Sequence, residues 1–162
     1  MSHLYNNGIL CPKPILDKSG KILQKVLNKS SSIVSFLPGK QLTTIELDHC
    51  FQIGEYMAKM HIASINFPQQ KNNDLGKDSW EKLLNLCIKS KVSIEKNNID
   101  MIGNTLRKII CDWPKDLPKG QIHGDLFTDN VFFQKDKLSG VIDFYFSCTE
   151  ILAFDIAISI NA

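Results

Sequence analysis

The sequence has little that would place it among nucleic-acid-binding or membrane-spanning proteins. Its 19 lysines and arginines are nearly balanced by 17 aspartates and glutamates, and a formal net charge of +2 gives no field that would attract a polyanion. No run of about 18 consecutive apolar residues occurs, and the first residues lack a basic stretch followed by an apolar one. We therefore expect no nucleic-acid partner, no membrane partner and a cytoplasmic location.

Cysteine pairs and glycine-rich loops are also missing. The five cysteines are an odd number without a Cys-x-x-Cys pair, which argues against a disulfide framework or a structural zinc site and predicts reduced, mostly buried thiols. The nine glycines contain no Gly-x-Gly-x-x-Gly, and Gly39-Lys40 lacks the other residues of a P-loop. The usual cradle for nucleotide phosphates is therefore not encoded in this chain.

What is present is the pattern of a globular α/β protein, with 43% hydrophobic and 22% charged residues. The prolines restrict residues 9–16 to extended or edge structure, and residues 21–27 and 32–37 are typical of a short antiparallel pair of strands. After a break at Pro38-Gly39, the periodicity predicts helices over 43–61, 79–88 and 95–111, strands at 121–124, 131–133 and 139–144, and a helix over 149–160.

The first of these helices has the clearest sequence signature. Thr43 and Glu46 form a capping-box pattern, which satisfies free amide groups at a helix start. Three- and four-residue spacing then predicts one inward-facing set of side chains: Leu47, Cys50, Phe51, Gly54, Met57, Ala58 and His61. On this face His61 is interpreted as a core histidine with a hydrogen-bond partner and not as a ligand.

Three polar side chains in residues 121–144 have the spacing of a phosphoryl-transfer site. Asp125 and Asn130 match the Asp-x-x-x-x-Asn of a kinase catalytic loop, in which Asp accepts the substrate hydroxyl proton and Asn binds Mg²⁺. Asp143 follows on an apolar strand, where an acid is costly unless it is paired or bound to metal. Because oxygen ligands suit Mg²⁺, the pattern predicts Asp125 as catalytic base and Asn130 and Asp143 as metal ligands.

Simpler interpretations exist for each of these residues. An isolated His-Gly-Asp is more often a surface turn, and Asn130 could merely satisfy the backbone of its own loop. His123 is predicted to brace the loop by hydrogen bonds. The sequence allows two interpretations of Asp155, which could hold the loop from behind or be an exposed helix residue.

Residues 123–130 resemble the aminoglycoside-phosphotransferase and choline-kinase superfamily, whose fold is similar to that of protein kinases. The longer stretch 122–133, together with residues 138–148, Phe154-Asp-Ile-Ala-Ile158 and Cys11-Pro-Lys-Pro14, is similar to its homoserine kinase branch. The resemblance implies an α/β (α+β), protein-kinase-like fold, mostly the helical C-lobe. Residues 1–39 would then be remnant N-lobe strands and the hinge, and residues 40–162 a C-lobe truncated at its C-terminus.

The same resemblance implies an activity and a set of roles. The enzyme would transfer the γ-phosphoryl group of ATP to the hydroxyl of L-homoserine, giving O-phospho-L-homoserine in threonine biosynthesis, with Mg²⁺ bound by Asn130 and Asp143. Asp125 would be the catalytic Asp, and Asp155 matches the acidic residue that follows the metal-binding Asp in such enzymes. The backbone of Ser35, Phe36 and Leu37 would contact adenine.

Complete members of that family are longer than this chain. The resemblance implies an N-terminal lobe with the phosphate loop and its lysine before Met1, or on a separately encoded chain, and further helices after Ala162. We therefore expect the fragment to be inactive alone. The alternatives are another small-molecule kinase of the superfamily, acting on choline or an aminoglycoside, and a catalytically dead folded remnant.

Overall fold

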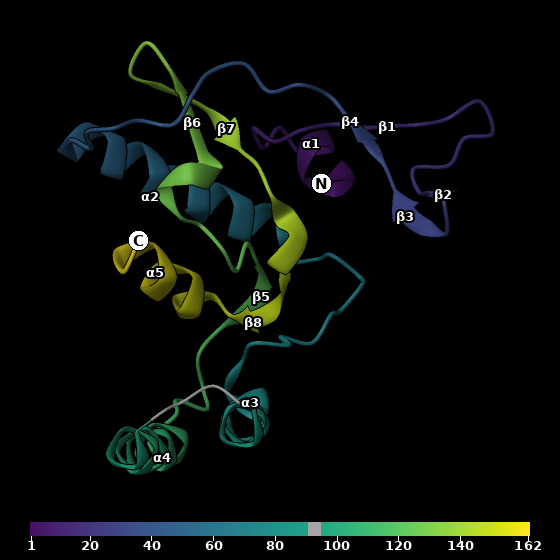
Figure 1. Cartoon of the computed structure of the whole chain (residues 1–162). Coiled ribbons are helices and arrows are strands. Elements are labelled where there is room, and N and C mark those ends of the chain that lie inside the picture. Colours follow the sequence, from purple (N-terminus) through teal and green to yellow (C-terminus); the bar gives the residue numbers. More distant parts are fainter. Residues whose placement is uncertain (91–94) are drawn as a thin grey trace.

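The computed structural model describes residues 1–90 and 95–162 as a mixed α/β structure of helices and two-stranded antiparallel sheets (Figure 1). The helices are α1 Ser2–Asn6, α2 Leu47–Ser64, α3 Lys77–Lys89, α4 Lys96–Cys111 and α5 Leu152–Ile160, with short 3-10 turns η1 Thr128–Asn130 and η2 Phe144–Phe146. The strands are β1 Pro14–Ile15, β2 Gln24–Val26, β3 Lys29–Ser31, β4 Ile33–Val34, β5 Lys119–Ile122, β6 Val131–Gln134, β7 Lys137–Val141 and β8 Cys148–Ile151. None of the helices described is long and apolar enough to span a bilayer.

The hydrophobic core lies between the β6–β7 hairpin and helices α1 and α2 (Figure 1). Val131 and Phe133 alternate along β6 and point inward with Val141 of β7, and Met57 and Met60 of α2 belong to the same buried cluster. The hairpin was predicted over 131–133 and 139–144, and the structure confirms both strands with different ends. The core therefore holds the start of β6, which follows Asn130, and the end of β7, which precedes Asp143.

A second strand pair, β5–β8, was only half predicted. β5 pairs antiparallel with β8, with Ile122 opposite Cys148 and Lys119 opposite Ile151. The helix predicted over 149–160 is therefore wrong for its first residues, since α5 begins at Leu152. Cys148 and Ile151 are buried, and the backbone groups of β5 need a hydrogen-bonding partner, so tertiary pairing overrides the local helical pattern here.

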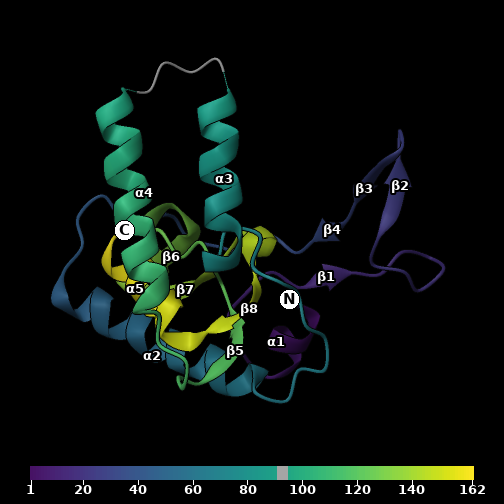
Figure 2. The same cartoon turned by 90° about the horizontal axis from the view of Figure 1, so that it is seen from below.

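The N-terminal strands form an arm that extends away from the core (Figure 2). The predicted pairing of 21–27 with 32–37 is wrong. β2 instead turns back on β3 through Leu27 and Asn28, both with positive φ, while β1 pairs with β4. Two such residues make the tight turn that matches the twist of a hairpin, and Asn tolerates this conformation.

Helix α2 begins later than predicted, and only the C-terminal part of its predicted inward face is buried. Its N-cap is Glu46, whose N–H donates to Nδ1 of His49 at 3.0 Å, so the capping box lies three residues beyond the predicted one. Leu47 is 90% exposed and Phe51 71% exposed, although both were predicted to face inward. Of the predicted set Met57 and His61 are buried, and the helix buries His49, Tyr56, Met60 and Ser64 with them.

Helices α3 and α4 form an antiparallel hairpin that projects from the rest of the molecule (Figure 2). The predictions of helices over 79–88 and 95–111 are confirmed, apart from small shifts at their starts. At the base of the hairpin Trp113 packs edge-on against Trp80 and against Phe154 of α5. The prediction that most cysteines are buried is wrong, since only Cys11 and Cys148 are buried and Cys50, Cys87 and Cys111 are exposed.

Candidate active site

The segment between β5 and β6 is organised around His123, which is fully buried. Its Nε2 lies 2.9 Å from the carbonyl oxygen of Ile142, and its Nδ1 accepts the N–H of Asp125 at 3.3 Å. Burial lowers the pKa of His123, so the ring is neutral near pH 7, with one nitrogen free to donate and the other to accept. Its ring also packs edge-on against Phe144, 4.7 Å between centroids, which joins the two loops that flank the hairpin.

Asp155 lies beneath this loop and is not an exposed helix residue, because its exposed fraction is 0%. Its Oδ2 accepts the N–H of His123 at 3.0 Å and lies 2.9 Å from Nε2 of His61, and its Oδ1 accepts the N–H of Gly124 at 3.0 Å. Burial alone would raise the pKa of Asp155, but the hydrogen bonds lower it, so the carboxylate is ionised near pH 7.

Gly124 has a geometric reason to be glycine. Its φ is +78°, and a Cβ atom at this position would lie 2.8 Å from the carbonyl oxygen of Phe146. The loop that carries Asp125 and the η2 turn therefore approach each other more closely than another residue would allow.

Asp125 and Asn130 are brought into direct contact. Nδ2 of Asn130 donates to the backbone oxygen of Asp125 at 2.8 Å and to its Oδ2 at 3.1 Å. Asp125 is half-buried and Asn130 is buried. The Asn130 amide thus orients the Asp125 carboxylate, and its own Oδ1 makes no hydrogen bond with any of the residues described.

Asp143 is not on an apolar strand, and that prediction is wrong. β7 ends at Val141; the N–H of Ile142 still donates to the carbonyl of Asn130 at 2.9 Å, and the chain then turns into η2. Asp143 caps η2 in the left-handed region, with φ 60° and ψ 65°, and its side chain is exposed. Aspartate tolerates this left-handed conformation. The carboxylate of Asp143 therefore lies at the start of η2, next to Phe144.

The donor atoms near Asp125 decide whether a metal could bind there. Among residues 1–90 and 95–162, no three His, Cys, Asp or Glu side chains form a cluster that could hold an ion by themselves. The exposed carboxylate of Asp143 and the unpaired Oδ1 of Asn130 are nevertheless hard oxygen donors of the kind that bind Mg²⁺ together with waters and phosphate oxygens. The chemistry of these two donors is therefore compatible with Mg²⁺, and their role as its ligands stays a prediction.

Leu37, at the end of the predicted hinge (residues 35–37), lies beside Gly140 of β7. The N–H of Ser35 already donates to the carbonyl of Lys13 at 2.8 Å, which leaves it unable to bind adenine. Phe36 is 88% exposed, and the backbone groups of Phe36 and Leu37 make no hydrogen bond with the described residues. Just beyond, Lys40 and Phe133 exchange backbone hydrogen bonds at 3.0 and 2.8 Å, which ties the hinge to β6.

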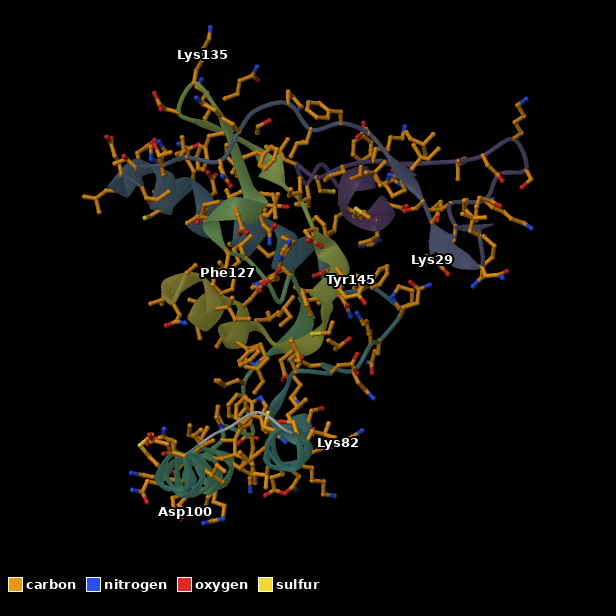
Figure 3. The ribbon with its side chains drawn as sticks, viewed as in Figure 1. Lys29, Lys82, Asp100, Phe127, Lys135 and Tyr145 are labelled. Carbon is orange, nitrogen blue, oxygen red and sulfur yellow. The ribbon has the colours of Figure 1, made fainter. Side chains whose placement is uncertain are left out.

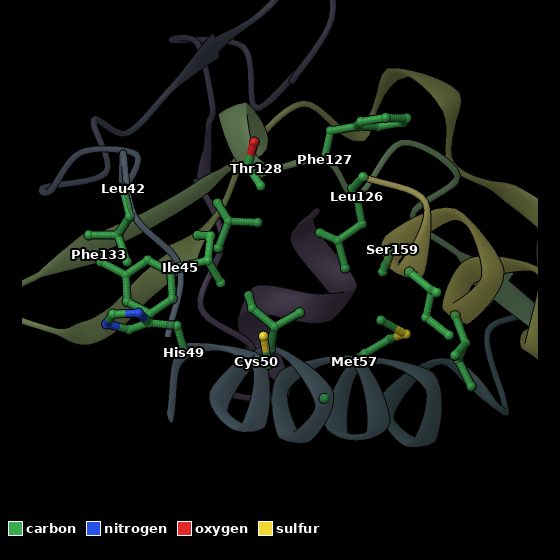
Figure 4. A pocket seen from close by; sticks show the side chains of 16 residues that line it. Leu42, Ile45, His49, Cys50, Met57, Leu126, Phe127, Thr128, Phe133 and Ser159 are labelled. Atoms are coloured by element: carbon green, nitrogen blue, oxygen red, sulfur yellow. The ribbon is translucent and has the colours of Figure 1, made fainter. Parts of the chain in front are cut away.

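Two hollows adjoin the loop. A cavity of about 240 Å³, called the Asp125 cavity below, is lined by Asn73, Leu75, Gly124, Asp125, Phe127, Phe146, Phe154, Ile158 and Asn161. An apolar groove of about 470 Å³ between α2, α5 and residues 126–133 is lined by Leu42, Met57 and Phe133 among others but not by Asp125 (Figure 4). Figure 3 shows Phe127 on the loop and Tyr145 on the η2 turn in the middle of the molecule. Of these two hollows, the Asp125 cavity is the one that the predicted base lines.

Two parts of the site were not assigned from the sequence. His61 was interpreted only as a core histidine, yet it is the side chain that contacts Asp155. Residues 66–77 were predicted as a polar loop, yet the N–H of Thr149 in β8 donates to the carbonyl of Lys71 at 2.7 Å. The inward position of His61 was a signal for the first, whereas nothing local indicated the second.

Comparison with solved structures gives the fold class. The chain superposes on amicoumacin kinase hAmiN with a TM-score of 0.69 and 21% identity, covering 97% of this chain and 49% of that one. Choline kinase from Cryptosporidium parvum gives a TM-score of 0.68 at 19% identity, over 94% and 48% of the two chains. The fold is thus the protein-kinase-like fold of the aminoglycoside-phosphotransferase and choline-kinase enzymes.

Sequence comparison then gives the family. The family model described as "Phosphotransferase enzyme family" (APH) matches residues 1–162, and the chain belongs to this family. It is 41% identical over 162 residues to a homoserine kinase from Granulibacter bethesdensis and 40% identical to one from Brucella canis, in each case over 100% of this chain. These alignments cover 51% and 50% of the relatives, so the chain spans about half the length of the curated relatives it matches.

Proposed function

We propose that this chain is part of an enzyme that transfers the γ-phosphoryl group of ATP to the hydroxyl of L-homoserine, yielding O-phospho-L-homoserine for threonine biosynthesis. Residues 40–162 would form most of its C-lobe, and residues 1–39 the last N-lobe strands and the hinge. Identity of about 40% to curated homoserine kinases over all 162 residues supports this acceptor. The likeness to the other kinases, at 21% identity or less, supports the fold alone.

The loop geometry carries the chemical part of the proposal. Asp125 is oriented by the Asn130 amide and stands at a cavity, as a base that accepts a hydroxyl proton must. Mg²⁺ held by Asn130 and Asp143 would neutralise charge on the phosphate oxygens during transfer. Asp155 and His123 would keep the loop in one conformation, which matters because phosphoryl transfer depends mainly on positioning and electrostatics.

The test uses a full-length enzyme that contains this chain. With ATP and Mg²⁺ it should phosphorylate L-homoserine with a higher kcat/KM than choline or an aminoglycoside. A comparable or better value for either of these would move the assignment to another small-molecule kinase of the family. No phosphoryl transfer to any of them would favour a catalytically dead protein.

The 162-residue chain alone should turn over little ATP. Its sequence contains neither a glycine-rich phosphate loop nor a strand lysine suited to the α and β phosphates. The measurement is Mg²⁺-dependent phosphorylation of L-homoserine by the purified chain, and robust turnover would contradict the expectation.

A further inference from the structure

The segment from Gln69 to Leu75, between α2 and α3, is attached to the strands that carry the candidate site. Gln121 of β5 donates from Nε2 to the carbonyl of Gln69 at 3.0 Å. Lys71 and Thr149 exchange two hydrogen bonds, the N–H of Thr149 to the Lys71 carbonyl at 2.7 Å and the N–H of Lys71 to Thr149 Oγ1 at 3.2 Å. The segment therefore forms a fixed wall beside β8.

This wall brings Asn73 to the Asp125 cavity in a defined orientation. Nδ2 of Asn73 donates to Glu150 Oε2 at 3.3 Å, and its Oδ1 accepts the N–H of Leu75 at 3.0 Å. A side-chain amide has two N–H donors and two acceptor lone pairs. After these two contacts, one N–H donor and one acceptor lone pair of Asn73, a residue that lines the cavity, have no partner among the described residues.

The remaining walls restrict the chemistry of such a molecule. Phe127, Phe146, Phe154 and Ile158 are apolar, and no Lys or Arg of the described residues lines the cavity. The charged groups that line the cavity or contact Asn73 are the carboxylates of Asp125 and Glu150, while the Lys71 ammonium is bound outside the lining to the Tyr145 carbonyl at 3.0 Å. At about 240 Å³ the cavity is smaller than pockets for drug-sized ligands, which begin at about 300 Å³. This combination favours a small alcohol that carries an ammonium group.

We propose that the Asp125 cavity is the acceptor subsite and that Asn73 determines its specificity by accepting a hydrogen bond from the substrate ammonium while the substrate hydroxyl lies at Asp125. This inference rests on the proposed function, and it adds the residue that recognises the end of the acceptor remote from the hydroxyl. A trimethylammonium group has no N–H to donate, so Asn73 discriminates against choline.

The experiment compares Asn73→Ala with Asn72→Ala in the full-length enzyme. Asn72 is the exposed neighbour of the same residue type and does not line the cavity. The acceptors are L-homoserine and 4-hydroxybutanoate, which is the same molecule without the amino group. Asn73→Ala should lower kcat/KM for L-homoserine about 10-fold, the value of one hydrogen bond to a charged group, and change that for 4-hydroxybutanoate less than about 2-fold. Asn72→Ala should match the wild type, and the KM for ATP should be unchanged throughout.

The outcomes separate this proposal from the one it rests on. A wild-type enzyme that does not phosphorylate L-homoserine refutes the proposed function. If the wild type is active but Asn73→Ala loses the same factor with both acceptors, or behaves like Asn72→Ala, the subsite is wrong while the function stands. If Asn73→Ala does not fold, as judged by lost ATP binding, Leu75→Phe decides: it keeps Asn73 and fills the cavity, and an unchanged KM for L-homoserine would overturn the subsite.

Discussion

Replacing Asp155 by Asn tests whether an ionised carboxylate holds the loop of Asp125. The buried carboxylate accepts hydrogen bonds from the N–H groups of His123 and Gly124 and contacts His61. Asparagine has almost the same shape but only one acceptor oxygen. If that oxygen stays with Gly124, the new NH₂ group faces the N–H of His123, donor against donor.

The expected loss of stability follows from these contacts. A buried N–H without a partner costs about 1–3 kcal/mol, and a hydrogen bond to a charged group contributes about 1.5–3 kcal/mol. Losing the acceptor for His123 and the charge beside His61 should therefore lower the free energy of unfolding by about 3 kcal/mol. Since whole domains are stable by only about 5–15 kcal/mol, this loss is large enough to measure directly.

The assay is urea unfolding of the full-length enzyme followed by tryptophan fluorescence. Trp113 packs against Phe154, the residue before Asp155, so its emission reports on this end of α5. Asp112→Asn, at an exposed position, is the matched control and should change the unfolding free energy by less than about 0.5 kcal/mol. An Asp155→Asn protein as stable as this control would refute the reasoning.

Three further predictions concern the candidate site. In the full-length enzyme Asp125→Asn should lower kcat by about 10²-fold or more without raising the Mg²⁺ requirement, whereas Asp143→Asn should raise that requirement; Mg²⁺ titration showing the reverse pattern would exchange their roles. Gly124→Ala should lower the melting temperature and kcat together, because its Cβ would lie 2.8 Å from the Phe146 carbonyl oxygen at a φ of +78°; an unchanged melting curve would contradict this. Finally, the pKa of His123 is lowered by burial, so the unfolded chain binds more protons below about pH 6.5, and stability should decrease as pH falls from there through the folded-state pKa; His123→Gln should flatten this part of the urea-midpoint profile.

Helix α4 and the β6–β7 hairpin could be predicted because their signals are local. The 3.6-residue periodicity of α4 and the alternation of Val131 and Phe133 are properties of neighbouring residues. The inward face of α2 was predicted correctly for Met57 and His61 but not for Leu47 and Phe51, which fit the same periodicity and are exposed. Which of several apolar stripes is buried depends on the partner that packs against the helix.

The sequence alone determined the candidate loop, since Asp125 and Asn130 lie five residues apart and a single turn can bring them into contact. Tertiary structure decided what supports that loop. His61 and Asp155 are 94 positions apart, and Lys71 and Thr149 are 78 apart, yet each pair is hydrogen-bonded. Periodicity and propensity report only on neighbours along the chain, whereas these contacts form because α5 and β8 fold back on α2 and β5 to satisfy buried polar groups.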